Sequence, residues 1–137
     1  MAHASLMDRY YDLSGLSSIG QQVGSKFEIA SFKFGYGFVD ESGPVPILLP
    51  IPSDTASIGG VFFTGVPQMS YSNGRLLLRC EMPKGSIATG QTKHSSVCGI
   101  FDKDDNLLAA TVTQPSWLTE DDLHVIEAYI DNVLAGV

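Results

Sequence analysis

The sequence is short of positive charge, and its few cationic residues are scattered. Eight lysines and arginines stand against fifteen aspartates and glutamates, which gives a formal net charge of -7. No lysine- or arginine-rich stripe occurs along the chain. Because nucleic acids and anionic membranes are bound through clustered cations, we expect no nucleic-acid partner and no membrane partner.

Cysteines and long apolar runs are also scarce. Cys80 and Cys98 are too few for a disulfide framework, and both lie in apolar segments. We expect two buried reduced thiols, with one disulfide as the alternative. No apolar run approaches the ~20 residues of a membrane span, and the first dozen residues lack a signal-peptide core. A soluble protein made in the cytoplasm is the simplest expectation.

Glycine and proline are plentiful, and they divide the chain into short segments. The 137 residues include 14 glycines and 7 prolines, and 44% are hydrophobic, which is typical of one folded domain rich in strands. We predict a mainly β fold of the α+β type, an antiparallel β-sandwich with a short N-terminal helix. Residues 1–24 would form that helix and a join, and residues 25–137 the β-rich body.

Residues with helical spacing predict the N-terminal helix, and turn residues predict the strands. The helical set is Leu6, Arg9, Tyr10, Leu13, Leu16 and Ile19. Alternation predicts a strand within 25–39, and the four prolines that follow predict a loop with an edge segment at 47–49. Asn73-Gly74 predicts a hairpin turn that leads into a strand at 75–82, because both residues tolerate positive φ.

Residues 119–134 fit two structures. Thr119 could cap a helix with Asp122 reaching back, and Leu123, Ile126 and Ile130 would share one helical stripe. A strand would instead place Ile126, Ala128 and Ile130 on one face. The sequence leaves both a C-terminal helix and a C-terminal strand open.

The stretch "CGIFDKDDNLLAAT", residues 98–111, places three aspartates and an asparagine between two apolar runs. Asp102, Asp104 and Asn106 match the first ligand offsets of a calcium loop. However, Leu107 and Thr113 occupy the positions that require glycine and glutamate. A polar turn at 103–106 between two strands is the better prediction, and Gly99 suggests a bulge or a close approach of another backbone. We therefore expect no metal site here.

This hairpin resembles the "(I/V)GLFDADGNLIA" hairpin of the phage tail-collar fibre family, whose N-terminal domains join tail fibres to the virion. The matching residues are Gly99, Ile100, Phe101, Asp102, Asp104, Asn106, Leu107, Leu108 and Ala109. Residues 13–37 resemble the opening helix and strand of that family, and residues 61–86 resemble its paired strands. In that family the segment that matches 122–131 is usually a strand.

The resemblance implies a structural virion protein, a collar or adaptor subunit that attaches tail fibres to the tail or baseplate. Family members usually continue into a fibre, whereas this sequence ends at Val137, so it implies nothing about receptor binding. We expect a protein located in the virion tail, a homotrimer or ring subunit that contacts other tail proteins. The predicted contact residues are Tyr10, Tyr11, Leu13, Leu16 and Ile19, and the structural hairpin residues are Gly99, Phe101, Asp102, Asp104 and Asn106.

Catalytic patterns are weak, so we predict no enzyme activity and no cofactor. His94 and Cys98 could be a base and a nucleophile, but a strand would hold them about 13 Å apart on one face. His3, His94 and His124 show no metal-ligand spacing. The acidic run 120–122 suits a helix start or a solvated loop.

The alternative function is a small carbohydrate-binding β-module that recognises a host surface. Such a module would use exposed aromatic rings beside polar side chains. The candidates are Trp117, Tyr71, Tyr36 and Phe38.

Overall fold

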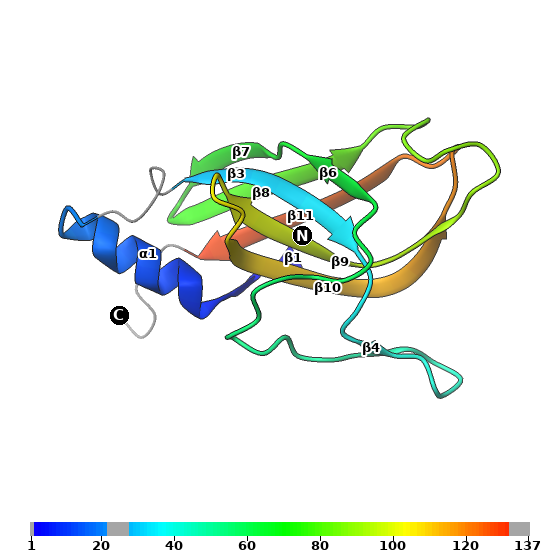
Figure 1. Ribbon diagram of the computed structural model, residues 1–137, viewed down its shortest axis with the longest axis horizontal. Helices are drawn as coiled ribbons and strands as arrows, with labels where there is room; N and C mark the ends of the chain where they lie inside the picture. Colours follow the sequence, from blue (N-terminus) through cyan, green and yellow to red (C-terminus); the bar gives the residue numbers. More distant parts are fainter. Residues whose placement is uncertain (1, 22–27, 132–137) are drawn as a thin grey trace.

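The computed structural model describes residues 2–21 and 28–131. Over these residues the protein is mainly β, with two sheets, a two-stranded ribbon and one helix (Figure 1). The first sheet has the order β1 (Ala2–His3), β11 (His124–Asp131), β8 (Arg75–Met82), β7 (Gln68–Ser72). The second sheet has the order β2 (Ser5–Leu6), β10 (Leu107–Leu118), β9 (Lys93–Asp102), β3 (Ile29–Gly35), β6 (Phe63–Gly65). The ribbon pairs β4 (Val39–Asp40) with β5 (Ile47–Leu48).

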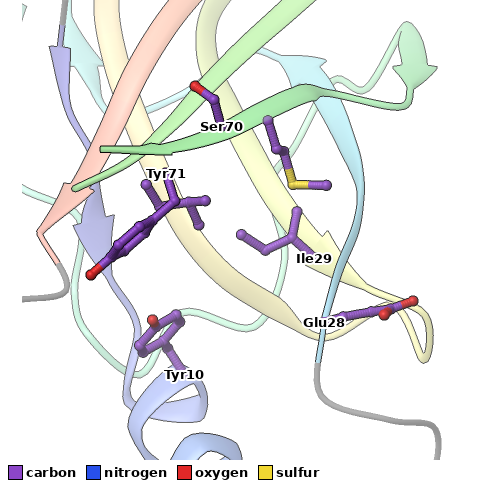
Figure 2. A pocket seen from close by; sticks show the side chains of 7 residues that line it. Tyr10, Glu28, Ile29, Ser70 and Tyr71 are labelled. Carbon is purple, nitrogen blue, oxygen red and sulfur yellow. The ribbon is translucent and has the colours of Figure 1, made fainter. Parts of the chain in front are cut away.

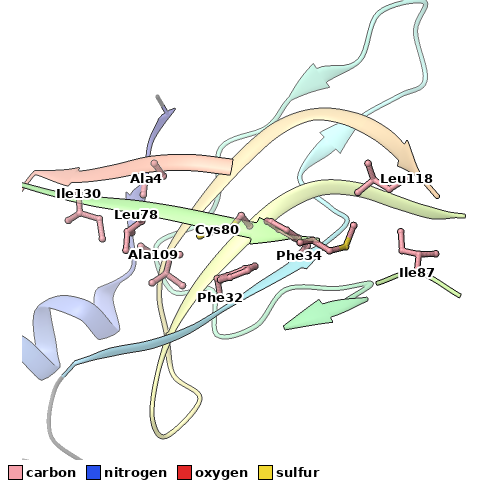
Figure 3. Packing of buried hydrophobic residues seen from close by; sticks show 13 residues of the cluster. Ala4, Phe32, Phe34, Leu78, Cys80, Ile87, Ala109, Leu118 and Ile130 are labelled. Atoms are coloured by element: carbon pink, nitrogen blue, oxygen red, sulfur yellow. The ribbon is translucent and has the colours of Figure 1, made fainter. Parts of the chain in front are cut away.

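The main core lies between the two sheets, which confirms the predicted sandwich. Phe32 and Phe34 from β3 meet Leu78 and Cys80 from β8 in one buried cluster (Figure 3). A second cluster lies on the other face of the second sheet, where Val97 and other side chains pack under the segments around the ribbon. Burial of these apolar side chains is the main stabilising term of the fold.

The N-terminus ties the two sheets together, which the sequence did not reveal. β1 runs parallel to β11, and β2 runs antiparallel to β10, so the chain crosses between the sheets at the buried Ala4. The helix α1 spans only Asp8–Ser18, so the expectation of a helix and join over residues 1–24 is wrong for residues 2–6. Leu6, a member of the predicted helical set, lies in β2. Residues 22–24 lie outside the described residues.

Most predicted strands are present, with changes at their ends. Asn73 and Gly74 have φ of 52° and 77°, and β8 begins and ends at the predicted residues. The predicted edge segment at 47–49 appears as β5. β3 begins at Ile29, and residues 25–27 of the predicted strand lie outside the described residues. An irregular pairing at Ala30 interrupts the alternation of the two faces, so that Ile29 packs against the same cluster as Phe32.

The C-terminal segment is a strand, so the helix alternative for residues 119–134 is wrong within the described part. The carboxylate of Asp122 does reach back, and it accepts a hydrogen bond of 2.7 Å from the Thr119 backbone N–H. That bond closes a turn and not a helix, because His124–Asp131 then pairs residue by residue with β8. Ala128 and Ile130 enter the core, and the residues after Asp131 lie outside the described part.

Among residues 2–21 and 28–131, no helix combines the length and the apolar character that crossing a membrane requires.

Candidate functional site

The aspartate cluster at residues 102–106 builds a turn. Oδ1 of the buried Asp102 accepts hydrogen bonds of 2.9 Å from the backbone N–H groups of Asp104 and Asn106. Its Oδ2 accepts a third, of 2.9 Å, from the side-chain amide of Asn106. Asp105 takes a φ of 66°, the left-handed conformation that aspartate tolerates. The Asp102 carboxylate therefore holds the β9–β10 connection.

The space left by the missing side chain of Gly99 is filled by neighbouring side chains and not by another backbone segment. A Cβ atom at Gly99 would lie 2.9 Å from a ring carbon of Phe101 and 3.1 Å from Leu107 Cδ1. The bulge of this hairpin lies one strand away, at Leu108 in β10, where the pairing slips by one residue. The glycine is therefore a packing requirement of the second apolar cluster.

The five residues predicted to contact a partner divide between two faces of α1. Leu13 is buried within its own chain, so its side chain offers little surface to a neighbouring subunit. Tyr11 and Ile19 are exposed, whereas Tyr10 and Leu16 are half-buried. The solvent-exposed part of the predicted contact surface therefore consists of Tyr11, Ile19 and the accessible parts of Tyr10 and Leu16.

Tyr10 forms one wall of an apolar groove of about 550 Å³. Figure 2 shows Tyr10 from α1 and Tyr71 from β7 on one side of it, with Ile29, the first residue of β3, and the preceding Glu28 across from them. Met69 and Leu76 complete the apolar lining. Burial, with a smaller contribution from the neighbouring Tyr11, raises the pKa of the Tyr10 hydroxyl above its ordinary value. The groove has the size of a site for several apolar side chains.

β7 is an open edge beside this groove. Its sequence, QMSYS, carries no charge, and all five residues are exposed. In the described part of the chain β8 is its one neighbour in the sheet. A residue of this strand, Met69, also lines the groove. The groove and the edge therefore form one continuous surface.

Three aromatic rings form a stack at the other end of β3. The rings of Tyr36 and His94 are 4.0 Å apart, and those of His94 and Trp117 are 4.1 Å apart with planes 3° from parallel. His94 in β9 and Trp117 in β10 are direct cross-strand partners, and Tyr36 follows the last residue of β3. Trp117, at the outer end of the stack, remains 64% exposed.

Glu41 joins two members of this stack. One of its carboxylate oxygens accepts a hydrogen bond from the Tyr36 hydroxyl, and the other lies 3.6 Å from His94 Nε2. The bond to Glu41 is the main reason why the pKa of Tyr36 is raised above its ordinary value. Glu41 therefore fixes the Tyr36 end of the stack, whereas the Trp117 end is exposed to solvent.

His94 and Cys98 have separate environments. His94 lies in the middle of the aromatic stack, whereas Cys98 lies in the core against Cys80. The expectation that they share a face is therefore wrong, because the β9–β10 pairing is irregular between Val112 and Ser116. A hydrogen bond with Cys80, together with burial, raises the pKa of the Cys98 thiol well above its ordinary value. A thiol held protonated in a core is a poor nucleophile.

Both cysteines are free thiols. Within the described ranges, no three histidine, cysteine, aspartate or glutamate side chains are grouped so that they could hold a metal ion. Phe38, a further candidate for sugar contact, has a φ of 58° and packs against the second apolar cluster. Tyr71 lines the groove beside Ile29, at the opposite end of β3 from the stack.

Comparison with known protein families, with characterised proteins and with solved structures found no match for this chain.

Proposed function

We propose that the chain is a structural subunit of a phage tail or tail-like particle, a collar or adaptor that attaches tail fibres to the tail or baseplate. Its role is assembly without catalysis, in contact with copies of itself and with other tail proteins. The resemblance of residues 98–111 to the tail-collar fibre hairpin supports this, and so does the structural use of Asp102 in that hairpin. The observation that carries the proposal is the open, uncharged edge of β7 beside the apolar groove.

The backbone of β7 is arranged to pair with another chain. Ser72 and Arg75 flank the two-residue turn and so form a hydrogen-bonded pair, and such pairs alternate along an antiparallel ladder. The N–H and C=O groups of Met69 and Tyr71 therefore point away from β8. Natural proteins usually protect such an edge with lysine, proline or a bulge. β7 has none of the three, which favours a partner that covers it.

The partner proposed for this edge is a second copy of the chain, which must associate through an uncharged surface. With a net charge of -7, two copies repel one another except where the facing surfaces are neutral. β7 and the apolar lining of the groove form such a surface. A trimer or ring requires two different surfaces that fit one another, and the exposed Tyr11 of α1 and Ile19 just after the helix are proposed as the second.

Immunoelectron microscopy of tail particles purified from the organism that encodes the chain tests the proposal. An antibody raised against the purified protein should label one level of the tail, at the collar or the baseplate. Particles that contain no trace of the protein by mass spectrometry would contradict the proposed function.

A further inference from the structure

We propose that Asn73, at the tip of the β7–β8 hairpin, is a site of spontaneous deamidation. The modification needs no enzyme and no partner, and it converts a neutral turn beside the edge strand into a charged or rearranged one. The chemistry is independent of the assembly role, and only its effect on self-association rests on that proposed function.

The turn exposes the groups that react. Asn73 and Gly74 are the two residues between the strands, and Asn73 is exposed. In a two-residue hairpin the flanking residues, here Ser72 and Arg75, form the last hydrogen-bonded pair of the ladder. The backbone N–H of Gly74 therefore has no place in the ladder, and glycine has no side chain to shield it.

The reaction joins the backbone of Gly74 to the side chain of Asn73. The Gly74 nitrogen loses its proton and attacks Cγ of Asn73, the new N–C bond closes a cyclic imide, and the Cγ–Nδ2 bond breaks with release of ammonia. Water then opens the imide at either carbonyl and gives aspartate or isoaspartate. The net change is the gain of water and the loss of ammonia, so the step requires no oxidant. Asparagine is counted among the thermolabile residues.

The closed hairpin slows the reaction, and its exposed edge strand permits it. At φ values of 52° and 77° both turn residues are held in the left-handed conformation, so the backbone must rotate before the Gly74 nitrogen reaches Asn73 Cγ. All five residues of β7 are exposed, and among the described strands β7 pairs with β8 alone. Such segments open locally at far lower free energy than global unfolding. The reaction therefore proceeds from the opened hairpin.

Asn106 is the matched internal control. It also lies in the connection between two strands, but its backbone N–H and its side-chain amide both donate to Asp102, each at 2.9 Å. The next residue, Leu107, is buried in the second apolar cluster, so the nitrogen that would attack lies in packed surroundings. The same residue type is here held away from the reaction.

Both products damage the edge strand. Isoaspartate carries the main chain through its side-chain carbon, which lengthens a turn whose two residues set the pairing of Ser72 with Arg75. Aspartate adds a negative charge beside an uncharged edge, on a chain that already carries -7. If copies associate through β7, as the proposed function requires, aged subunits should lose that contact.

Peptide mapping by mass spectrometry tests the site directly. We would incubate the full-length protein at physiological temperature, at mildly acidic and at mildly alkaline pH, beside a sample unfolded in guanidinium chloride. The tryptic peptide that ends at Arg75 should gain about 1 Da. The gain should be faster at alkaline pH, because the attacking nitrogen must lose its proton, and fastest in the unfolded sample. Asn106 should stay unmodified in the folded protein.

Asn73→Gly separates this ageing from any other change. Glycine adopts positive φ readily and has no amide to lose, so the variant should keep the hairpin and show no mass gain in that peptide. After the same incubation, the unmodified protein should lose thermal stability, and oligomer mass in light scattering, in proportion to its isoaspartate content. The variant should keep both.

Two results would overturn the proposal. The first is a folded protein in which residue 73 gains no mass, whether or not the unfolded sample reacts. The second is an equal gain at residues 73 and 106, which would remove any role of the turn. A strict monomer at the start would contradict only assembly through β7, since the mass gain at Asn73 and the loss of thermal stability need no partner.

Discussion

Another backbone segment lies close to Gly35, whereas Gly15 has open space around it. Replacement by alanine should therefore change stability in opposite directions at the two positions. A Cβ atom at Gly35 would lie 2.3 Å from the carbonyl oxygen of Gly59, the same oxygen that accepts the Tyr36 N–H. Backbone cannot move aside as a side chain can, so Gly35→Ala should lower the free energy of unfolding by about 3 kcal/mol. Urea denaturation would measure this loss.

Gly15 provides the matched control for that substitution. It lies inside α1, and a Cβ atom added there would meet nothing within 4 Å beyond its chain neighbours and the helix's own backbone. Alanine is a better helix former than glycine, so Gly15→Ala should raise the free energy of unfolding by about 0.5–1 kcal/mol. Equal effects of the two substitutions would contradict the close approach of residues 35 and 59.

His124 gives the fold a defined pH dependence. Burial lowers the pKa of its imidazole below the ordinary value, and the charge of Asp122 opposes this only in part. The unfolded chain therefore binds a proton at a higher pH than the folded chain does. The His124 contribution to stability is present above the unfolded pKa of about 6.5 and decreases as the pH falls through that value toward the lower folded pKa.

Replacing His124 isolates this effect. The centre of its ring lies 4.7 Å from that of Phe34, and His124 is not one of the three stacked rings. Between neutral pH and about pH 5.5, the unmodified protein should lose more stability than His124→Gln. Thermal unfolding across that range would measure the difference. Parallel curves for the two proteins would show that His124 does not titrate differently on folding.

At the scale of the element, the β9–β10 hairpin depends on one carboxylate. Asp102→Ala would leave the N–H groups of Asp104 and Asn106 without their acceptor, and it should lower stability by about 1–3 kcal/mol. Lys103→Ala is the control in the same turn. It removes an exposed ion pair with Glu28, whose effect should stay below about 1 kcal/mol. Equal losses in chemical denaturation would contradict the role of Asp102.

Short sequence patterns predicted the turns and strands whose conformation depends on residues close in the sequence. Asn73-Gly74 and the strand Arg75–Met82 were predicted correctly, because positive φ at two residues fixes the hairpin. Thr119 and Asp122 make the predicted hydrogen bond, but the next segment is a strand because pairing with β8 overrides the local helix signal. β1 and β2 have two residues each, too short for any periodicity to reveal.

At the scale of the whole molecule, the candidate surfaces depend on contacts between distant segments. The groove joins α1, β3 and β7, and the aromatic stack joins residues 36, 94 and 117. The sequence singled out Tyr36, Tyr71 and Trp117 as candidates. It could not show that Tyr36 and Trp117 stack on the same residue, His94. Glu41 carried no signal in the sequence, because its role arises from the position of the β4–β5 ribbon.

The open edge of β7 can be blocked without disturbing the core. Met69→Lys and Tyr71→Lys place charge at two exposed positions of that edge, and charged edges resist pairing with another strand. Ile47→Lys is the matched control, since Ile47 is 59% exposed and lies on the ribbon. The double edge variant should dissociate to the monomer while its thermal unfolding stays close to that of the control.

Light scattering of the purified protein at micromolar concentration is the decisive measurement of self-association. We expect the mass of a trimer or larger ring for the unmodified protein and for Ile47→Lys, and the mass of a monomer for the Met69→Lys, Tyr71→Lys double variant. A strict monomer without any substitution, or an oligomer whose mass the double variant leaves unchanged, would contradict assembly through β7.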